Sequence, residues 1–137
     1  MDCPRAALAA AAEALVGTPF RLHGRDPQTG LDCIGLYTAA RAAIGRPVNI
    51  PPCYGLRNRD IAGILARAGT DGLTNAQGLI LAGDVVLTRF SPIQVHLLVA
   101  VVGNRFVHAH AGLRRVVTMP GPLALPLISH WRLTDPS

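Results

Sequence analysis

The order of the hydrophobic patterns along the chain constrains its fold more than any other feature. The first half of the 137 residues carries stretches with the apolar spacing of helices, and the second half carries short apolar runs bounded by turn formers. Consecutive strands without helices between them pair most simply as an antiparallel sheet. The sequence therefore predicts an α+β fold, with N-terminal helices packed on a C-terminal antiparallel sheet, rather than alternating βαβ units.

Three helices are expected in the first half. Residues 5–16 are largely apolar and are followed by glycine and proline, which end helices. A second helix begins after Asp32, a favourable N-cap residue, and stops before Gly45. A weaker third helix covers residues 56–68. Cys33 is thus expected in the first turn of the second helix.

The strands are expected after residue 84. Thr18–Leu31 and Gly69–Gly78 are rich in turn formers and are predicted to be loops, and Pro47–Pro52 is predicted to be extended. The predicted strands are residues 85–88, 95–102, 105–110, 114–119 and approximately 127–133.

Length and hydropathy limit the class of protein. A chain of this length fills one hydrophobic core, so residues 1–137 are expected to form a single domain. No apolar stretch reaches the roughly 18 residues of a membrane span, so no membrane partner is expected. The N-terminal segment carries Asp2 early and lacks a basic region, which argues against a secretory signal peptide. Synthesis in the cytoplasm is therefore expected.

The charge of the chain suggests an anionic partner but not a nucleic acid. The net charge is +5, and every basic residue is arginine. A basic surface attracts anionic polymers such as those of the cell wall, although the arginine bias is also compatible with mere solubility. Only six residues are aromatic and no arginine cluster is interleaved with them, so a platform for single-stranded nucleic acid is not expected.

The cysteines indicate a free thiol rather than a disulfide framework or a metal site. Cys3, Cys33 and Cys53 form an odd set without a CxxC pair, so neither structural zinc nor a cofactor is expected. A free thiol has a pKa of about 8.5 and needs help to ionise at neutral pH. The N-terminus of a helix favours the anion, so Cys33 is a candidate nucleophile, while a small buried core residue is the alternative interpretation.

Histidines on two neighbouring predicted strands are candidates for the base. His96 lies in the run QVHLLVAVV, and His108 and His110 lie in FVHAH. Because side chains alternate along a strand, a two-residue turn at Gly103-Asn104 would place His96 and His108 on opposite faces. A three-residue loop would instead place His110 opposite His96, with His108 as a diagonal neighbour. Pattern alone leaves the choice between His108 and His110 open.

These motifs resemble those of a known family. Residues 17–37, GTPFRLHGRDPQTGLDCIGLY, are similar to the G-T-P-Y loop and the D-C-S-G-L helix start of NlpC/p60 cell-wall peptidases. Residues 83–86 resemble the family's G-D-L-V strand start, and residues 94–109 resemble its H-V-G-I-Y-L-G-N-G-x-F-I-H-A segment. The resemblance covers roughly residues 15–111, in the correct order.

The resemblance implies a papain-like fold and assigns the catalytic residues. Cys33 matches the nucleophile, His96 the general base and His108 the residue that orients the imidazole. Phe20, Asp32 and His23 are expected to border the substrate. The implied reaction is hydrolysis of peptidoglycan stem peptides, of the D-glutamyl-diamino acid endopeptidase type.

The sequence departs from the family at three positions. Phe20 replaces a tyrosine, Ile34 follows the cysteine in place of serine, and Leu98 replaces a small glycine. Because of these changes, two alternatives to a peptidase remain. One is a catalytically inactive structural or wall-binding module, and the other is a papain-like amidase that acts on another amide.

The apparent absence of a leader and of a second module resembles the short peptidases of phage tails and gene-transfer agents. Tail proteins are then expected partners, with incorporation into a phage-like particle. The sequence assigns no role to Cys3, Cys53, His110, His130 or Trp131.

Overall fold

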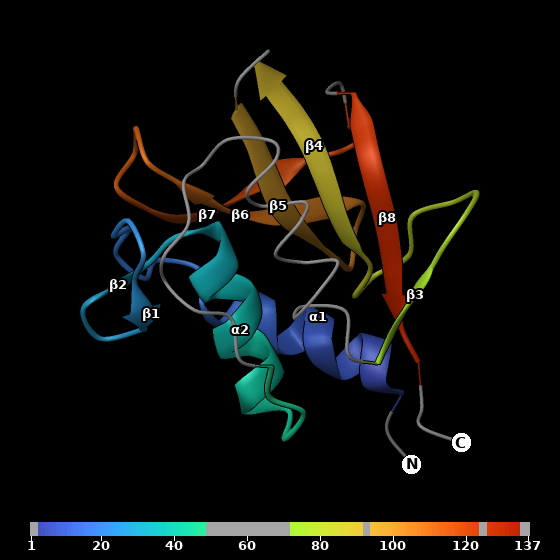
Figure 1. Cartoon of the computed structure of the whole chain (residues 1–137), viewed down its shortest axis with the longest axis horizontal. Coiled ribbons are helices and arrows are strands. Elements are labelled where there is room, and N and C mark those ends of the chain that lie inside the picture. Colours follow the sequence, from blue (N-terminus) through green and yellow to red (C-terminus); the bar gives the residue numbers. More distant parts are fainter. Residues whose placement is uncertain (1–2, 49–71, 92–93, 124–125, 135–137) are drawn as a thin grey trace.

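Among the described residues, two helices lie on one face of a six-stranded antiparallel sheet (Figure 1). The structure, a computed structural model, describes residues 3–48, 72–91, 94–123 and 126–134. The helices are α1 (Pro4–Ala14) and α2 (Cys33–Ala43). The expected α+β fold class is confirmed. The expected third helix lies outside the described residues, and no described helix is long and apolar enough to span a membrane.

The sheet has the strand order β3-β8-β4-β5-β6-β7, and a separate two-stranded hairpin, β1-β2, precedes α2. The hairpin strands are β1 (Arg25–Asp26) and β2 (Gly30–Leu31). The strands of the sheet are β3 (Leu73–Asn75), β4 (Val85–Ser91), β5 (Gln94–Val101), β6 (Arg105–His110), β7 (Arg115–Pro120) and β8 (Leu127–Leu133).

The five strands expected after residue 84 are present, with boundaries that differ by at most three residues. The short strands β1, β2 and β3 were not expected, because their sequences were interpreted as turns. Strands of two or three residues show no alternation that a pattern can detect. Their pairing is decided by partners distant in sequence, as in β3, where Leu73 lies opposite Leu133.

Capping residues set both ends of helix α2. The Oδ1 atom of Asp32 accepts the backbone N–H of Gly35 at 2.8 Å, as an N-cap does. At the other end Gly45 has a φ of 75°, a left-handed conformation that glycine adopts without strain. The predicted first turn at Cys33 is therefore confirmed.

Alternate residues of β5 face two different apolar layers. Val95, Leu97, Val99 and Val101 belong to the main core between the sheet and the helices. On the opposite face, a smaller cluster consists of Val86, Leu98, Ala100 and Phe106. His96 has the parity of this second face, since it alternates with Leu97.

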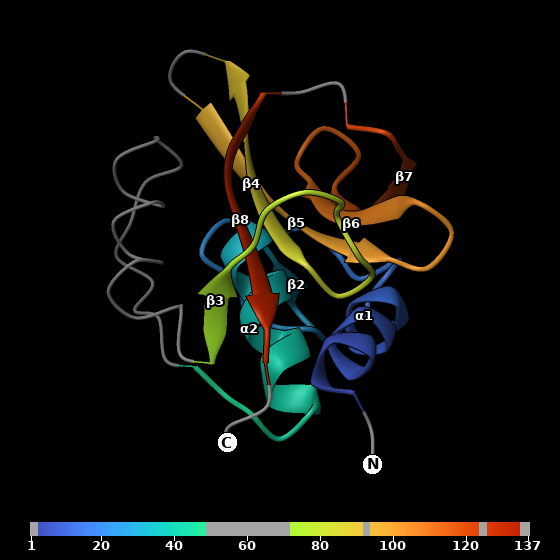
Figure 2. The same cartoon turned by 90° about the vertical axis from the view of Figure 1, so that its right-hand side faces the viewer.

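The sheet is strongly twisted. In Figures 1 and 2, β6 and β7 run across the direction of β4 and β8. The N-terminal connection follows this twist and packs on the outer edge of β7. There Val116 donates its N–H to Thr18 at 2.8 Å and accepts the N–H of Gly17 at 2.8 Å, and Phe20 donates to Arg114 at 2.9 Å. The connection between α1 and α2 is thus hydrogen-bonded to the C-terminal half of the sheet.

Candidate active site

Cys33 is the first residue of α2 and is almost completely buried. Its exposed fraction is 3%, and it belongs to the main core between α2 and the sheet. At the helix start, the backbone N–H groups of Cys33 and Ile34 hydrogen-bond its sulfur, because the first turn of a helix has no preceding carbonyls to bind them. The site is therefore built around a thiol that solvent scarcely reaches.

A gap between β5 and β6 receives this thiol. Ala100 exchanges hydrogen bonds with Gly83 and Asp84 on the β4 side, so the alternating odd residues of β5 direct their N–H groups towards β6. The β5–β6 ladder runs from Val101–Arg105 to Val99–Val107, which leaves the amide of Leu97 beyond its end. The backbone of Leu97 hydrogen-bonds Cys33 instead. The sulfur thus lies against the residue that follows His96.

His96 and His108 contact each other across the same gap. Nε2 of His108 lies 3.0 Å from Nδ1 of His96, and the ring planes meet at 84°. The three-residue loop 102–104 connects β5 to β6, since Val101 pairs with Arg105. With this register the two histidines share one face of the sheet, as the three-residue loop predicts.

His110 lies next to this pair but has a different hydrogen bond. Its ring centroid is 5.4 Å from that of His108, and its Nδ1 atom accepts the backbone N–H of Leu113 at 3.0 Å. Of the two candidates, the structure shows the diagonal neighbour, His108, hydrogen-bonded to His96, and the catalytic role of His108 stays a prediction.

Burial governs the protonation of Cys33. Desolvation, and then the negative charge of Asp32, raise the pKa of the thiol to about 12. The backbone hydrogen bonds of Leu97, Ile34 and Cys33 itself act in the opposite direction but do not offset burial. The lowered pKa expected from the helix terminus is therefore wrong for this conformation, in which the thiol is protonated at neutral pH.

Both histidines of the pair are neutral at the same pH. Desolvation, followed by the charge of His110, lowers the pKa of His96. Desolvation, followed by His96 and His110, lowers the pKa of His108 to about 4. The site at neutral pH thus holds a thiol and two uncharged imidazoles.

The hydrogen bond between two neutral imidazoles controls which nitrogen of His96 is basic. If His108 donates, His96 carries its own proton on Nε2 and cannot accept one there. If His96 donates from Nδ1, its Nε2 keeps a lone pair and can accept the proton of a thiol. An accepting His108 therefore makes His96 competent as a base.

The three expected substrate-bordering residues occupy different environments. Phe20 is half-buried and packs against the main core. Asp32 has no exposed surface, and its Oδ2 atom accepts the backbone N–H of His23 at 2.9 Å. His23 is half-buried with a φ of 60°. Their contact with a substrate stays a prediction.

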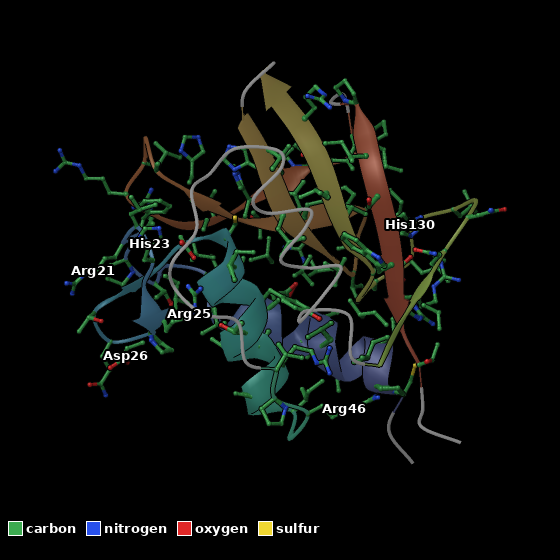
Figure 3. All side chains as sticks on the ribbon, viewed as in Figure 1. Arg21, His23, Arg25, Asp26, Arg46 and His130 are labelled. Carbon is green, nitrogen blue, oxygen red and sulfur yellow. The ribbon has the colours of Figure 1, made fainter. Side chains whose placement is uncertain are left out.

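Sequence reasoning missed the backbone of Leu97 and the side chain of Arg25. Nη1 of Arg25 lies 3.2 Å from Oδ1 of Asp32, and the arginine is located between β1 and α2 (Figure 3). The sequence shows only that Arg25 lies seven residues before the N-cap Asp32. Without the fold of the hairpin, this spacing does not indicate that the two residues form an ion pair. Among the described residues, no group of three or more His, Cys, Asp or Glu residues is placed to hold a metal ion.

His130 lies on β8, away from His23 and Arg25 of the hairpin region (Figure 3), and belongs to a separate cluster. Its Nε2 atom lies 2.7 Å from Oδ2 of Asp84, and Arg132 contacts both oxygens of that carboxylate at 2.8 Å. Burial raises the pKa of Asp84, but hydrogen bonds from Arg132, the Leu81 amide and His130 outweigh it and hold the pKa below its ordinary value. This cluster fastens β4 to β8.

Comparisons with known proteins agree in fold. No family model matches the sequence, and no curated protein is significantly similar to it. The NlpC/p60 domain of the peptidoglycan hydrolase SagA is 24% identical over 85% of this chain and 88% of that domain, with a TM-score of 0.56. The P60 domain of an antigen from M. avium subspecies paratuberculosis is 15% identical over 95% and 93% of the two chains, with a TM-score of 0.64.

NlpC1 from Trichomonas vaginalis superimposes with a TM-score of 0.71 at 18% identity; the match covers 96% of this chain but 45% of the Trichomonas protein. The chain has the NlpC/p60 fold. The papain-like architecture expected from the motifs is thereby confirmed.

Within the NlpC/p60 fold, two of the three sequence departures are absorbed by packing. Ile34 has no exposed surface and lies in the main core, and Leu98 lies in the smaller cluster on the other face. Their larger apolar side chains therefore fill the interior on either side of the sheet.

Proposed function

We propose that the protein is a cysteine peptidase that hydrolyses the stem peptides of peptidoglycan. The observation that carries the proposal is the junction at β5, where the Cys33 sulfur binds the backbone of Leu97 and the preceding residue, His96, is hydrogen-bonded to His108. A nucleophile, a base and a residue that orients the base are the three parts that thiol-dependent acyl transfer requires.

In the proposed reaction the Cys33 sulfur attacks the scissile carbonyl as its proton passes to Nε2 of His96. Because thiol and imidazole are both neutral at rest, the thiol proton must move to His96 for the sulfur to attack. Backbone N–H groups at the start of α2 stabilise the oxyanion. The C–N bond breaks as His96 returns the proton to the leaving amine, and water activated by His96 then hydrolyses the thioester.

The substrate class is inferred from the fold and the motifs together. SagA, which shares the fold, is a peptidoglycan hydrolase. The bond between D-glutamate and the diamino acid is the cleavage site that the family resemblance implies, and association with phage-tail proteins in a phage-like particle is proposed from the same source.

Digestion of purified peptidoglycan tests the proposal. The wild-type protein is expected to release muropeptides that mass spectrometry identifies, and Cys33→Ser is expected to release none. Cys3→Ser is the matched control, because Cys3 is an exposed thiol before α1 and its loss should leave the yield unchanged. Equal release by wild type and Cys33→Ser would exclude Cys33 as the nucleophile.

A catalytically inactive module of the same fold is the alternative that one observation favours. Cys33 is 3% exposed and its pKa is raised to about 12. Alkylation by iodoacetamide separates the two functions. If Cys33 is alkylated near neutral pH, and the alkylation is slower in His96→Ala, the result supports the peptidase. If Cys33 is not alkylated with or without His96, and the protein releases no muropeptides, the result supports the inactive module.

A further inference from the structure

The cap of α2 places a negative charge beside the nucleophile. The Asp32 carboxylate accepts the N–H of Gly35 at 2.8 Å through Oδ1 and that of His23 at 2.9 Å through Oδ2. It therefore joins the loop before the hairpin to the first turn of the helix. The carboxylate has no exposed surface, so solvent does not screen it.

This charge opposes the chemistry of the next residue. Cys33 must lose a proton during attack, and an adjacent buried carboxylate disfavours the thiolate. Asp32 is the largest contribution after burial to the raised pKa of the thiol. The Asp32 carboxylate thus stabilises the start of the helix but disfavours ionisation of Cys33.

A cation from β1 lies where it reduces this conflict. Nη1 of Arg25 is 3.2 Å from Oδ1 of Asp32, and the same atom donates to the carbonyl of Gly24 at 3.2 Å. Pairing of Arg25 with Leu31 in the hairpin fixes the backbone next to Asp32. We propose that Arg25 is a positioning residue for the reaction, which neutralises the Asp32 carboxylate and so eases ionisation of Cys33. The inference rests on the proposed function, because it concerns the same thiol.

Among the described residues, Asp32 is the charged group whose field raises the pKa of the thiol. β5 and β6 contribute histidines, β1 contributes the exposed Asp26, and the buried residues of α1 are Leu8, Ala9 and Ala12. The titratable and charged groups on α2 and its cap, on the described elements packed against it and on the loop before β1 are Arg5, Glu13, Arg21, His23, Arg25, Asp26, Asp32, Tyr37, Arg41, His96, Arg105, His108 and His110. Of these, Arg25 is the cation within ion-pair distance of Asp32.

Alkylation rates of Cys33 test the proposal without any substrate. The rate constant for iodoacetamide at Cys33 is measured by peptide mass spectrometry between pH 7 and 9, with exposed Cys3 as the internal reference. Without Arg25, the buried charge of Asp32 stands unopposed beside Cys33 and should raise the pKa of the thiol by about one unit, so Arg25→Gln should react about tenfold more slowly. Asp32→Asn, which keeps a capping oxygen, should react faster than wild type.

The double variant Arg25→Gln/Asp32→Asn distinguishes charge from loop structure. Removing both charges restores the net charge of the pair, so its rate should return close to that of wild type. A double variant as slow as Arg25→Gln would overturn the proposal, because Arg25 would then act through the loop alone. Arg25→Lys should retain most of the rate, and if Arg25→Gln does not fold, Asp32→Asn must still react faster than wild type.

Arg21→Gln is the matched control. Arg21 lies on the same connection but is exposed and points outward (Figure 3), so its removal should change the rate less than twofold. Equal slowing by Arg21→Gln and Arg25→Gln would contradict the inference. Muropeptide kinetics give the second readout, with kcat lowered and KM retained in Arg25→Gln. If the wild-type protein cleaves no muropeptide but the alkylation rates of the variants differ as expected, the proposed function is wrong and the role of Arg25 stands.

Discussion

At the scale of single residues, the proposed mechanism gives His108 the most specific task in the site. Its pKa is lowered to about 4, first by burial, so it stays neutral at the pH of a peptidase reaction and can accept a hydrogen bond. A protonated His108 would be a donor on both nitrogens and would force the unproductive tautomer on His96. Burial of this side chain thus protects the basicity of its neighbour.

Replacing His108 tests the tautomer assignment. His108→Ala removes the acceptor for Nδ1 of His96, and kcat is expected to fall about 100-fold with little change in KM. His108→Asn offers a carbonyl oxygen to the same proton and should retain more activity than the alanine variant. Steady-state kinetics on a purified muropeptide measure both effects.

His110→Ala is the control, because His110 contacts the ring of His108 but binds the Leu113 amide. Its activity is expected to stay within a few-fold of wild type. Equal activity of the alanine and asparagine variants at position 108 would contradict a role in accepting the proton.

The residues that sequence could identify were those whose chemistry is local. A capping aspartate before a cysteine and an apolar helix fixes Cys33 at a helix start without knowledge of the tertiary structure. The choice between His108 and His110 depended on one residue of loop length, which pattern does not determine. The contact of the Leu97 backbone with Cys33 depends on the gap between β5 and β6, and that of Arg25 with Asp32 depends on the β1-β2 hairpin. Long-range packing creates both features, so local sequence does not predict them. The raised pKa of Cys33 likewise depends on burial, which local sequence does not specify.

At the scale of elements, the loop before the β1-β2 hairpin packs against the first turn of α2 without room for a side chain. A Cβ atom added to Gly35 would overlap the backbone oxygen of Gly24 and lie 3.3 Å from Oδ1 of Asp32. The loop therefore crosses directly over the first turn of the helix. This closeness is what brings Arg25 to the cap.

Gly35→Ala is expected to destabilise the protein. Alanine favours helix by about 1 kcal/mol over glycine, but displacing the loop costs about 2–3 kcal/mol, so a net loss of about 1–2 kcal/mol is expected. Urea unfolding followed by circular dichroism measures the free energy of unfolding. An unchanged or higher stability would show that the loop yields without strain.

At the scale of the whole molecule, the buried histidines make stability depend on pH. His108 has a pKa of about 4 in the folded protein, against an ordinary value of 6.5. Between these values the unfolded chain binds more protons, so stability falls as the pH decreases from about 6.5 to about 4. The lowered pKa of His96 acts in the same direction. Asp84, whose pKa is lowered, contributes a separate loss only below pH 3.8.

Urea unfolding at pH 7, 5.5 and 4.5 checks this dependence. Full protonation of His108 corresponds to a loss of about 3 kcal/mol, most of which should be visible by pH 4.5. His108→Asn should show a flatter profile over the same range, since the titrating group is removed. An identical slope in wild type and variant would assign the pH dependence to other groups.

The hydrogen bonds between residues 17–20 and β7 have a consequence for behaviour at high concentration. β7 ends the sheet on one side, and a free sheet edge is a template on which another chain can add a strand. Here the chain's own connection occupies the first part of that edge, and β3 at the other end is only three residues long. In the part of the chain that the structure describes, the start of the β7 edge is therefore closed to strand addition by another molecule.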